Sequence, residues 1–395
     1  VLGVSKNPNQ AYRAHKEKLG VARSRFYDKL NCTNTDVSEQ VVATMAPCIA
    51  TMQDALKFTP WEGIPGYRLL VVDGNHLEKT QKRIAELRDC GVAPLPGTAV
   101  ARFDLGRQIF DRVYLLEDAH QQEAVTCQAI VDDLEPSDVI VADRHYCIVE
   151  FMNQIAVNNH FAIRHHARLP GVLLGKRKKL GRIATGTVYE QAMRLKKQED
   201  SLVVRRITIE LDEPTQDGDL VIHLLTNLPG DVSGKLIAEL YHRRWEEETA
   251  FYYLRMCFNG ELPSLGHPRA ALFLFAMTLM AYNVLQVIWA AFFATHDDEE
   301  VQNISNLYVS QEIMSTTPGM LIILDDDEWD SLIPTSKKQV ARLLKQIAKK
   351  TSLADYRKSV RKPKPKTPRK KKPKKKANAK HSHLSTAKVI GLVDP

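Results

Sequence analysis

Tyr241-His-Arg-Arg-Trp-Glu-Glu-Glu-Thr-Ala-Phe-Tyr-Tyr-Leu-Arg255 predicts the helix to which the other motifs of the chain can be related. The segment contains no Gly or Pro, and it follows Pro229-Gly230 and Gly234, which interrupt the chain before it. At 100° per residue, one face of this helix carries four polar side chains: Tyr241, Arg244, Glu248 and Arg255. Glu246 and Glu247 point away from that face. Glu248 is therefore the candidate acid among the three consecutive glutamates.

This predicted face allows two interpretations. One carboxylate, two guanidinium groups and a phenol suit a phosphodiester held against a metal ion. The same side chains also fit a charged, solvent-exposed helix stabilised by Glu–Arg pairs near i,i+4 spacing. The segment alone gives the two interpretations about equal weight.

The composition is that of a large folded protein with an unevenly distributed charge. The 395 residues are 44% hydrophobic, which is enough for a large core and for two or three domains. The net charge is +8, but fourteen basic residues and no acid lie between Arg357 and Lys380, which leaves −6 for the rest. Six cysteines show no CxxC pair and no metal-ligand spacing, as in cytosolic proteins with reduced thiols. No signal peptide opens the chain, and since it begins at Val1 we expect a shortened N-terminal segment.

Two short apolar runs end on aspartates. Tyr67–Val72 predicts a buried strand followed by Asp73, and Val139–Ala142 predicts a second one followed by Asp143. Carboxylates at the ends of central strands are well placed for a site, although Asp73-Gly74 by itself also fits a plain turn. The neighbouring elements predicted from the pattern are strands 98–103, 109–116 and 160–164 and helices 119–134 and 147–157.

This order of elements predicts an α/β protein with a ribonuclease H-like mixed sheet and flanking helices. Residues 167–234 behave differently, since a basic loop, Leu173–Arg182, precedes a mostly charged stretch and two strands, 203–211 and 219–226. We expect a β-rich insertion that interrupts the sheet before the Glu248 helix returns to it. The basic side chains of the loop suit a phosphate backbone and, equally, a solvated charged face: Lys176, Arg177, Lys178 and Lys179.

The C-terminal third begins with a long apolar run, residues 270–295. Its length admits a transmembrane helix, but Asn283 and Gln286 near its middle favour a helix buried in a protein core. We expect the acidic cluster Asp325–Asp330 to be a solvated turn, followed by a helix over residues 336–352. The Lys/Pro-rich tail should be disordered and should attract polyanions.

Three motifs in this order resemble a transposase of the insertion-sequence-4 type, in the DDE superfamily. The signature of that family is Tyr, two residues, Arg, three residues, Glu, six residues, Lys. Here it corresponds to Tyr241, Arg244, Glu248 and Arg255, with Arg where Lys is usual. Val72-Asp73-Gly74 resembles the first-aspartate segment of the family, and Val141-Ala-Asp-Arg-His-Tyr146 resembles the second. The likeness covers roughly residues 20 to 295.

The resemblance implies an enzyme that cuts and joins DNA at insertion-sequence ends by cut-and-paste, through a hairpin intermediate. Asp73, Asp143 and Glu248 would be the catalytic carboxylates, and their hard oxygen atoms suit two Mg²⁺ or Mn²⁺ ions. The residues implied to hold DNA phosphates beside the cut are Tyr241, Arg244 and Arg255. The partner would be DNA, bound by a homodimer without a membrane. The location would be the cytoplasm, and the nucleoid when DNA is bound.

The expected organisation has six parts. They are a helical N-terminal segment (1–62), the first part of the catalytic domain (63–166), the β-rich insertion (167–234), the return of the catalytic domain (235–300), a C-terminal helical region (301–356) and the basic tail (357–395). Two other functions stay open. One is a DNA-binding remnant of such an enzyme that no longer cuts. The other is a membrane-associated protein that uses the apolar run and the tail.

Overall fold

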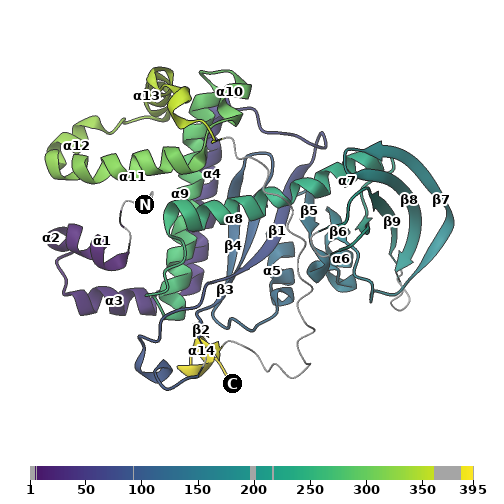
Figure 1. Ribbon diagram of the computed structural model, residues 1–395, viewed down its shortest axis with the longest axis horizontal. Helices are drawn as coiled ribbons and strands as arrows, with labels where there is room; N and C mark the ends of the chain where they lie inside the picture. The colour runs from purple at the N-terminus through teal and green to yellow at the C-terminus, as the bar shows by residue number, and fades with distance from the viewer. Residues whose placement is uncertain are drawn as a thin grey trace.

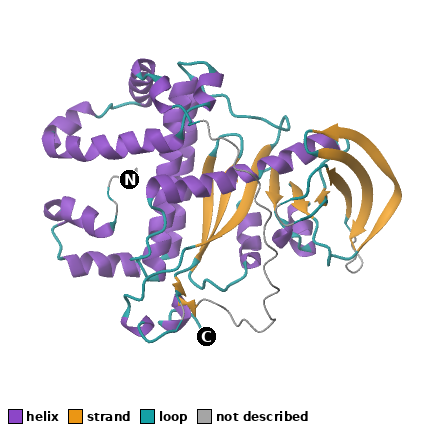
Figure 2. Ribbon diagram, in the orientation of Figure 1, coloured by secondary structure: helices purple, strands orange, loops and turns teal. Residues whose placement is uncertain are grey.

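A nine-stranded sheet runs through the protein, with helices packed against it (Figures 1 and 2). The computed structural model describes residues 5, 7–91, 93–195, 202–215, 218–359 and 384–394. The strand order is β4-β3-β1-β5-β6-β10-β9-β8-β7. A separate pair, β11 and β2, forms a two-stranded sheet.

The first five strands form the ribonuclease H-like part. The central strand β1 (Arg68–His76) runs antiparallel to β3 (Thr98–Asp104), which in turn pairs with β4 (Ile109–Leu116). On its other side β1 runs parallel to β5 (Asp138–Ala142), and β5 runs parallel to β6 (His160–Arg164). The fold class expected from the sequence is confirmed, and four of these five strands begin and end within one residue of their predicted bounds. β1 starts one residue later than predicted and continues to His76.

Alternate residues of the central strands enter two hydrophobic cores, one on each face of the sheet. Leu69 and Val71 of β1 face the core formed with the long helices α4 (Thr35–Ala55) and α9 (Pro268–Phe293). Leu70 and Val72 face the core formed with the short helices α5 (Cys127–Asp132) and α6 (Val149–Ile155). The helix predicted over 119–134 is thus reduced to its last part, because residues 119–122 form turns and Glu123–Thr126 form a 3₁₀ helix.

Residues 167–234 extend the sheet instead of interrupting it. β10 (Val221–Thr226) pairs with β6, and β9 (Val203–Leu211), β8 (Gly186–Leu195) and β7 (Gly171–Ile183) follow in order. The prediction of a basic loop at 173–182 is wrong, because this segment is most of β7. Its charged side chains are exposed on an edge strand, where lysines are common, so composition alone resembles a loop.

The predicted helix 241–255 is divided into two helices, α7 (Gly234–Arg243) and α8 (Trp245–Phe258). They meet at Arg244, whose N–H donates to the carbonyl of Tyr241 and whose carbonyl accepts from Glu247, each across three residues instead of four. The chain therefore continues in nearly the same direction with one tightened turn (Figure 1).

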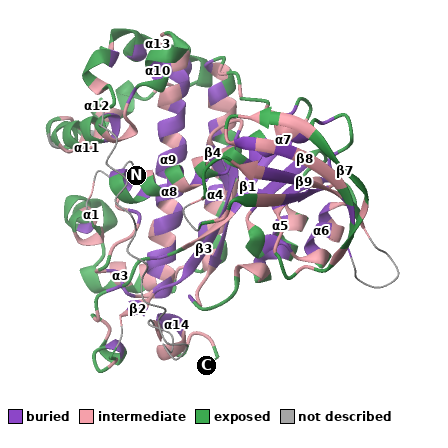
Figure 3. Ribbon diagram, turned by 45° about the vertical axis from the view of Figure 1, so that its right-hand side comes forward, coloured by how far each residue is buried: buried purple, intermediate pink, exposed green. Residues whose placement is uncertain are grey.

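The long apolar run forms the core helix α9, which is mostly buried in Figure 3. Among the described residues it is the one helix long and apolar enough to cross a membrane, and 67% of its most apolar window is buried. Asn283 explains its polar centre: the side-chain amide accepts from the Phe110 backbone N–H at 2.8 Å and donates to the Phe110 carbonyl at 2.7 Å. This pair of hydrogen bonds fixes α9 to the edge strand β4.

Smaller helices surround this core. The helices at its N-terminal side are α1 (Pro8–Ala14), α2 (Lys16–Leu19) and α3 (Arg23–Cys32), and those at its C-terminal side are α10 (Asp298–Gln302), α11 (Asn306–Ile323), α12 (Asp326–Leu332) and α13 (Lys337–Lys350). The acidic cluster was predicted as a solvated turn, but most of it lies in α12. A capping box formed by Asp325 and Glu328 starts this helix.

The predicted disordered tail lies mainly outside the described residues, which omit 360–383. Its last part differs from the prediction. β11 (Leu384–Ser385) pairs in parallel with β2 (Pro94–Leu95), and α14 (Thr386–Val389) follows with Ala387 fully buried. Lys388 adds an ion pair with Asp118 at 3.4 Å. The Lys/Pro-rich composition ends at Lys380, and the residues after it can pack.

Candidate active site

Two aspartates meet where the parallel strands β1 and β5 lie side by side. Val72 of β1 is the register partner of Ala142 of β5, so the next residues, Asp73 and Asp143, emerge at the same level of the sheet. β1 continues past Asp73 because its next residues still pair with β3. β5 ends at Ala142, and the Asp143 carboxylate accepts from the His145 N–H at 2.6 Å, which starts a short 3₁₀ turn.

Arg244 links this sheet edge to α8. Its Nη1 donates to Asp73 Oδ2 at 2.7 Å, and its Nη2 donates to Glu248 Oε1 at 2.8 Å. The side chain is 8% exposed, so the guanidinium lies almost buried between the two carboxylates. The structure therefore brings Asp73, Asp143 and Glu248 to one place. The Arg244 guanidinium lies between Asp73 and Glu248.

Two further acids that the sequence analysis missed lie beside Asp73. Glu247 is fully buried and both of its carboxylate oxygens lack a hydrogen bond. Glu123 Oε1 lies so close to Gly74 that a Cβ at that position would be only 2.1 Å away. The buried Tyr146 hydroxyl lies beside Glu123, and burial together with this neighbouring carboxylate raises the pKa of Tyr146 well above its ordinary value.

A signal in the sequence could have identified Glu247. The buried residues of α8 include Ala250, Phe251 and Leu254, which follow position 247 by three, four and seven residues. Glu247 therefore occupies the first position of an apolar stripe at helical spacing. No comparable pattern marks Glu123, because it belongs to an irregular segment before α5 and its position depends on the missing side chain of Gly74.

The pKa values reflect this excess of acid. Burial raises the pKa of Asp73 to about 6; Arg244 opposes the shift, whereas Glu123 and Asp143 add to it. Burial also raises the pKa of Glu247 well above the ordinary value, with Asp73 as the next contributor. Burial lowers the pKa of Arg244, but Asp73, Tyr241 and Glu248 together outweigh this effect and keep the guanidinium charged.

Hard carboxylate oxygens of this kind suit Mg²⁺ or Mn²⁺. Among the described residues, however, no group of three His, Cys, Asp or Glu side chains is arranged to hold a metal ion. Arg244 instead pairs with one oxygen each of Asp73 and Glu248. The unpaired buried oxygens of Glu247 nevertheless fit a cation, because an unpaired buried polar group costs about 1–3 kcal/mol.

The predicted DNA-contacting residues are divided between two places. Tyr241 and Arg244 are buried near the acids, with the Arg244 Cζ atom 5.9 Å from the Tyr241 ring, while Arg255 is exposed on α8. The basic residues of β7 are not brought to the acids: five strands separate β7 from β1 in the sheet. They are exposed, and Arg177 pairs with Glu210 at 2.6 Å.

The surface beside the acids is open. A hollow of about 510 Å³ is lined in part by His76, Glu123 and His145. On the other side of Arg244, Arg243 lies 3.5 Å over the ring of Trp61 and pairs with Glu246. Arg243 is therefore already engaged, and of the acids named above Glu123 is the one that lines the hollow.

Comparison with known proteins adds two findings. Residues 103–284 match the family described as Transposase DDE domain, a segment that contains Asp143 and Glu248 and begins after Asp73. Among solved structures, the chain is similar to piggyBac transposase in a cryo-EM synaptic complex with hairpin DNA. The identity is 9%, the TM-score is 0.36, and the match covers 72% of this chain and 58% of that one. No curated protein sequence matches the chain.

Proposed function

Because the chain carries a transposase DDE domain, we propose that it cuts and joins DNA at insertion-sequence ends by metal-dependent phosphoryl transfer, in a cut-and-paste reaction. One observation carries the proposal. Asp73 and Asp143 follow register partners on two parallel strands, and Arg244 connects Asp73 to Glu248. These are three carboxylates from two strands and a helix.

Asp73, Asp143 and Glu248 are proposed to hold the divalent ions. Two bound Mg²⁺ or Mn²⁺ ions would activate a water or a 3′-hydroxyl and stabilise the leaving oxygen. The residues of the chain have separate tasks: the three carboxylates fix the position of the reacting phosphodiester, and the buried Tyr241 supports the Arg244 end of the site. In the free protein Arg244 neutralises two of the carboxylates. Once these bind cations, its guanidinium becomes available for a DNA phosphate.

DNA contacts outside the cut are proposed for two exposed regions. Arg255 lies on α8, two turns beyond Glu248, where it can contact the backbone next to the cleaved bond. Lys176, Arg177, Lys178 and Lys179 on β7 would contact DNA at a distance from the acids. Neutralising phosphates in this way makes binding salt-dependent. A homodimer on paired ends, acting in the cytoplasm and on the nucleoid, completes the proposal.

The test is cleavage of labelled DNA that carries the element's own ends, with Mg²⁺ or Mn²⁺. Glu248→Gln should lower the cleavage rate at least about 100-fold while DNA binding is kept, because the variant loses a group that acts on the reacting atoms. Glu246→Gln is the matched control. Glu246 is the same residue type two positions away, paired with Arg243 and Gln108, and it should leave cleavage unchanged. Equal cleavage by Glu248→Gln and the unmodified chain would contradict the proposal.

One observation also supports a second function, a DNA-binding remnant that no longer cuts. Arg244 already neutralises Asp73 and Glu248, as in a site that has lost its need for cations. The same experiment separates the two functions. If the unmodified chain binds the DNA and does not cut it, under conditions in which a related transposase does, the remnant is the better description.

A further inference from the structure

Glu123 and Glu247, here called the inner acids, lie near Asp73 and are not among the three carboxylates of the proposed function. Glu247 has no exposed surface, and neither of its carboxylate oxygens has a hydrogen bond. Glu123 Oε2 and the Tyr146 hydroxyl are also buried, and these two side chains interact with each other. The two oxygens of Glu247 are thus unsatisfied, whereas buried polar groups in native proteins are nearly always paired.

An apolar residue at position 247 would suit the fold better than glutamate. Ala250, Phe251 and Leu254 occupy the same buried stripe of α8 and contribute to the large hydrophobic core. Burying a carboxylate there costs free energy that no contact within the described protein returns. The glutamate therefore points to a partner that the protein alone does not supply.

The surrounding charges identify the chemistry of that partner. Asp73, Glu123 and Glu248 act electrostatically on Glu247 as like charges, and Arg244 is the one opposing charge among its main neighbours. Both terminal nitrogens of Arg244 already donate to Asp73 and Glu248. A small divalent cation with a preference for carboxylate oxygens meets these conditions, whereas an organic cation would need more room than a fully buried position offers.

We propose that Glu247 and Glu123 are further ligands of a divalent cation, Mg²⁺ or Mn²⁺, that binds behind Asp73 on the inner side of the site. Asp73 completes the ligand set when it leaves Arg244 and turns toward the inner acids. Gly74 makes the arrangement possible, because any Cβ at this position would collide with the Glu123 carboxylate. The inference rests on the proposed function for the part of Asp73, and it assigns five carboxylates to the cations instead of three.

The first test counts Mn²⁺ ions bound to the full chain without DNA, by electron paramagnetic resonance and isothermal titration calorimetry. Glu247→Gln should remove one bound ion or weaken its binding at least tenfold. Glu246→Gln is the matched control and should bind Mn²⁺ like the unmodified chain. Unchanged number and affinity in Glu247→Gln would overturn the inference.

A second variant distinguishes the loss of a metal ligand from a folding defect. Glu247→Leu continues the apolar stripe, so the metal-free variant should have a higher Tm than the unmodified chain in EDTA. Mn²⁺ should raise the Tm of the unmodified chain and should raise that of Glu247→Leu less. An equal Mn²⁺-induced shift in both proteins would contradict the inference.

The metal-binding measurements test the inner ligands separately from the cleavage experiment, which tests the proposed function. If Glu248→Gln blocks cutting while Glu247→Gln binds Mn²⁺ normally, the proposed function stands and the inner ligands are rejected. If Glu247→Gln loses an ion but the unmodified chain does not cut DNA, the inner ligands stand and the proposed function is rejected.

Discussion

The two ends of strands β1 and β5 differ in how their charged side chains are paired. At their first residues, Arg68 and Asp138 form two hydrogen bonds of 2.8 and 2.7 Å, and at their far ends Asp73 and Asp143 lie side by side. The distance along the strands is only five residues, and the backbone pairing is continuous. The difference therefore comes from the side chains around each end.

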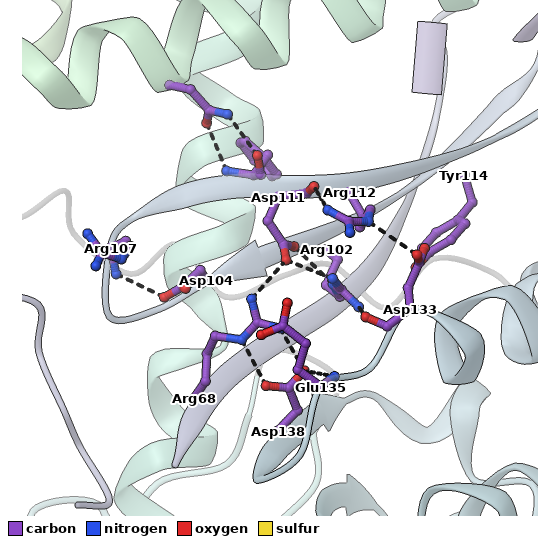
Figure 4. Close-up of polar contacts among 12 residues, drawn as sticks. Arg68, Arg102, Asp104, Arg107, Asp111, Arg112, Tyr114, Asp133, Glu135 and Asp138 are labelled. Atoms are coloured by element: carbon purple, nitrogen blue, oxygen red, sulfur yellow. Dashed lines mark hydrogen bonds and ion pairs between the residues drawn. The ribbon is translucent and has the colours of Figure 1, made fainter. Parts of the chain in front are cut away.

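The first end is balanced. Arg102 donates to both oxygens of Asp111 at 2.9 and 2.7 Å, Arg68 lies 3.5 Å from Asp111, and Figure 4 shows these side chains converging. Around them Arg112 pairs with Asp133, which also accepts from Tyr114 (Figure 4). Three arginines thus face three aspartates, and the exposed Glu135 lies 3.8 Å from Arg68 at the rim, so each buried charge of the network has a partner.

The far end is unbalanced. Its five acids are Asp73, Glu123, Asp143, Glu247 and Glu248, and Arg244 is the arginine that pairs with them. In a buried ion network that only stabilises the fold, each charge has a partner of opposite sign. An excess of carboxylates at one end therefore indicates a binding site for cations from solution. Three experiments test whether this difference is real.

The largest expected effect is at the balanced end. Asp111→Asn removes the carboxylate that compensates Arg102, whose side chain is 1% exposed, and should lower the free energy of unfolding by about 3–5 kcal/mol. Urea denaturation measures it. Asp54→Asn is the control, because Asp54 forms an exposed pair with Arg107 and should cost about 0–1 kcal/mol. A similar small loss in both variants would show that the two ends do not differ in the way described.

The second effect is a pH dependence at the acid-rich end, measured in EDTA. The folded-state pKa of Asp73 is raised to about 6, above its unfolded value of about 3.9, so its protonated form stabilises the fold. This contribution is complete below about pH 4 and is lost as the pH rises through 6, and it amounts to about 3 kcal/mol. Asp73→Asn should remove that part of the slope between pH 4 and 7. A slope equal to that of the unmodified chain would exclude Asp73 as its source.

The smallest effect concerns packing without a change of charge. Gly74→Ala adds a Cβ that must displace the Glu123 carboxylate, and it should destabilise the protein by about 1–2 kcal/mol. Gly230→Ala, with no atom within 4 Å of the added Cβ, should stay within about 0.5 kcal/mol. If the two variants are equally stable, Glu123 is not held against Gly74, and the inner side of the site is looser than described.

Much of the fold could be predicted because its signals are local. β4 and β6 were predicted to the residue, since apolar side chains fill both faces of short runs bounded by turns. β7 could not be predicted, because a charged segment becomes a strand only through its pairing with β8. The division at Arg244 also depends on tertiary contacts, namely the pairs that this residue makes with Asp73 and Glu248.

The candidate site was predictable to a similar extent. Asp73, Asp143 and Glu248 were indicated by strand ends and by a helical face, and the structure places them together. The ion pairs of Arg244 were not predictable, because Asp73 lies 171 residues away in the chain. Glu247 was not predicted as a site residue, because it lies outside the polar face of the predicted helix. Its burial follows instead from the apolar stripe of α8 that it begins.

The continuous order of strands from β1 to β7 has a consequence for the DNA contacts proposed above. Six strand-to-strand steps of about 4.8 Å give at most ~29 Å between the two strands, and the curvature of the sheet shortens the direct path. At about 3.4 Å per base pair, this corresponds to no more than ~8 base pairs. Measured across the sheet, a phosphate bound at Lys178 would therefore lie within one turn of the duplex from the scissile bond. The hydrogen-bonded backbone would hold that interval constant without a hinge.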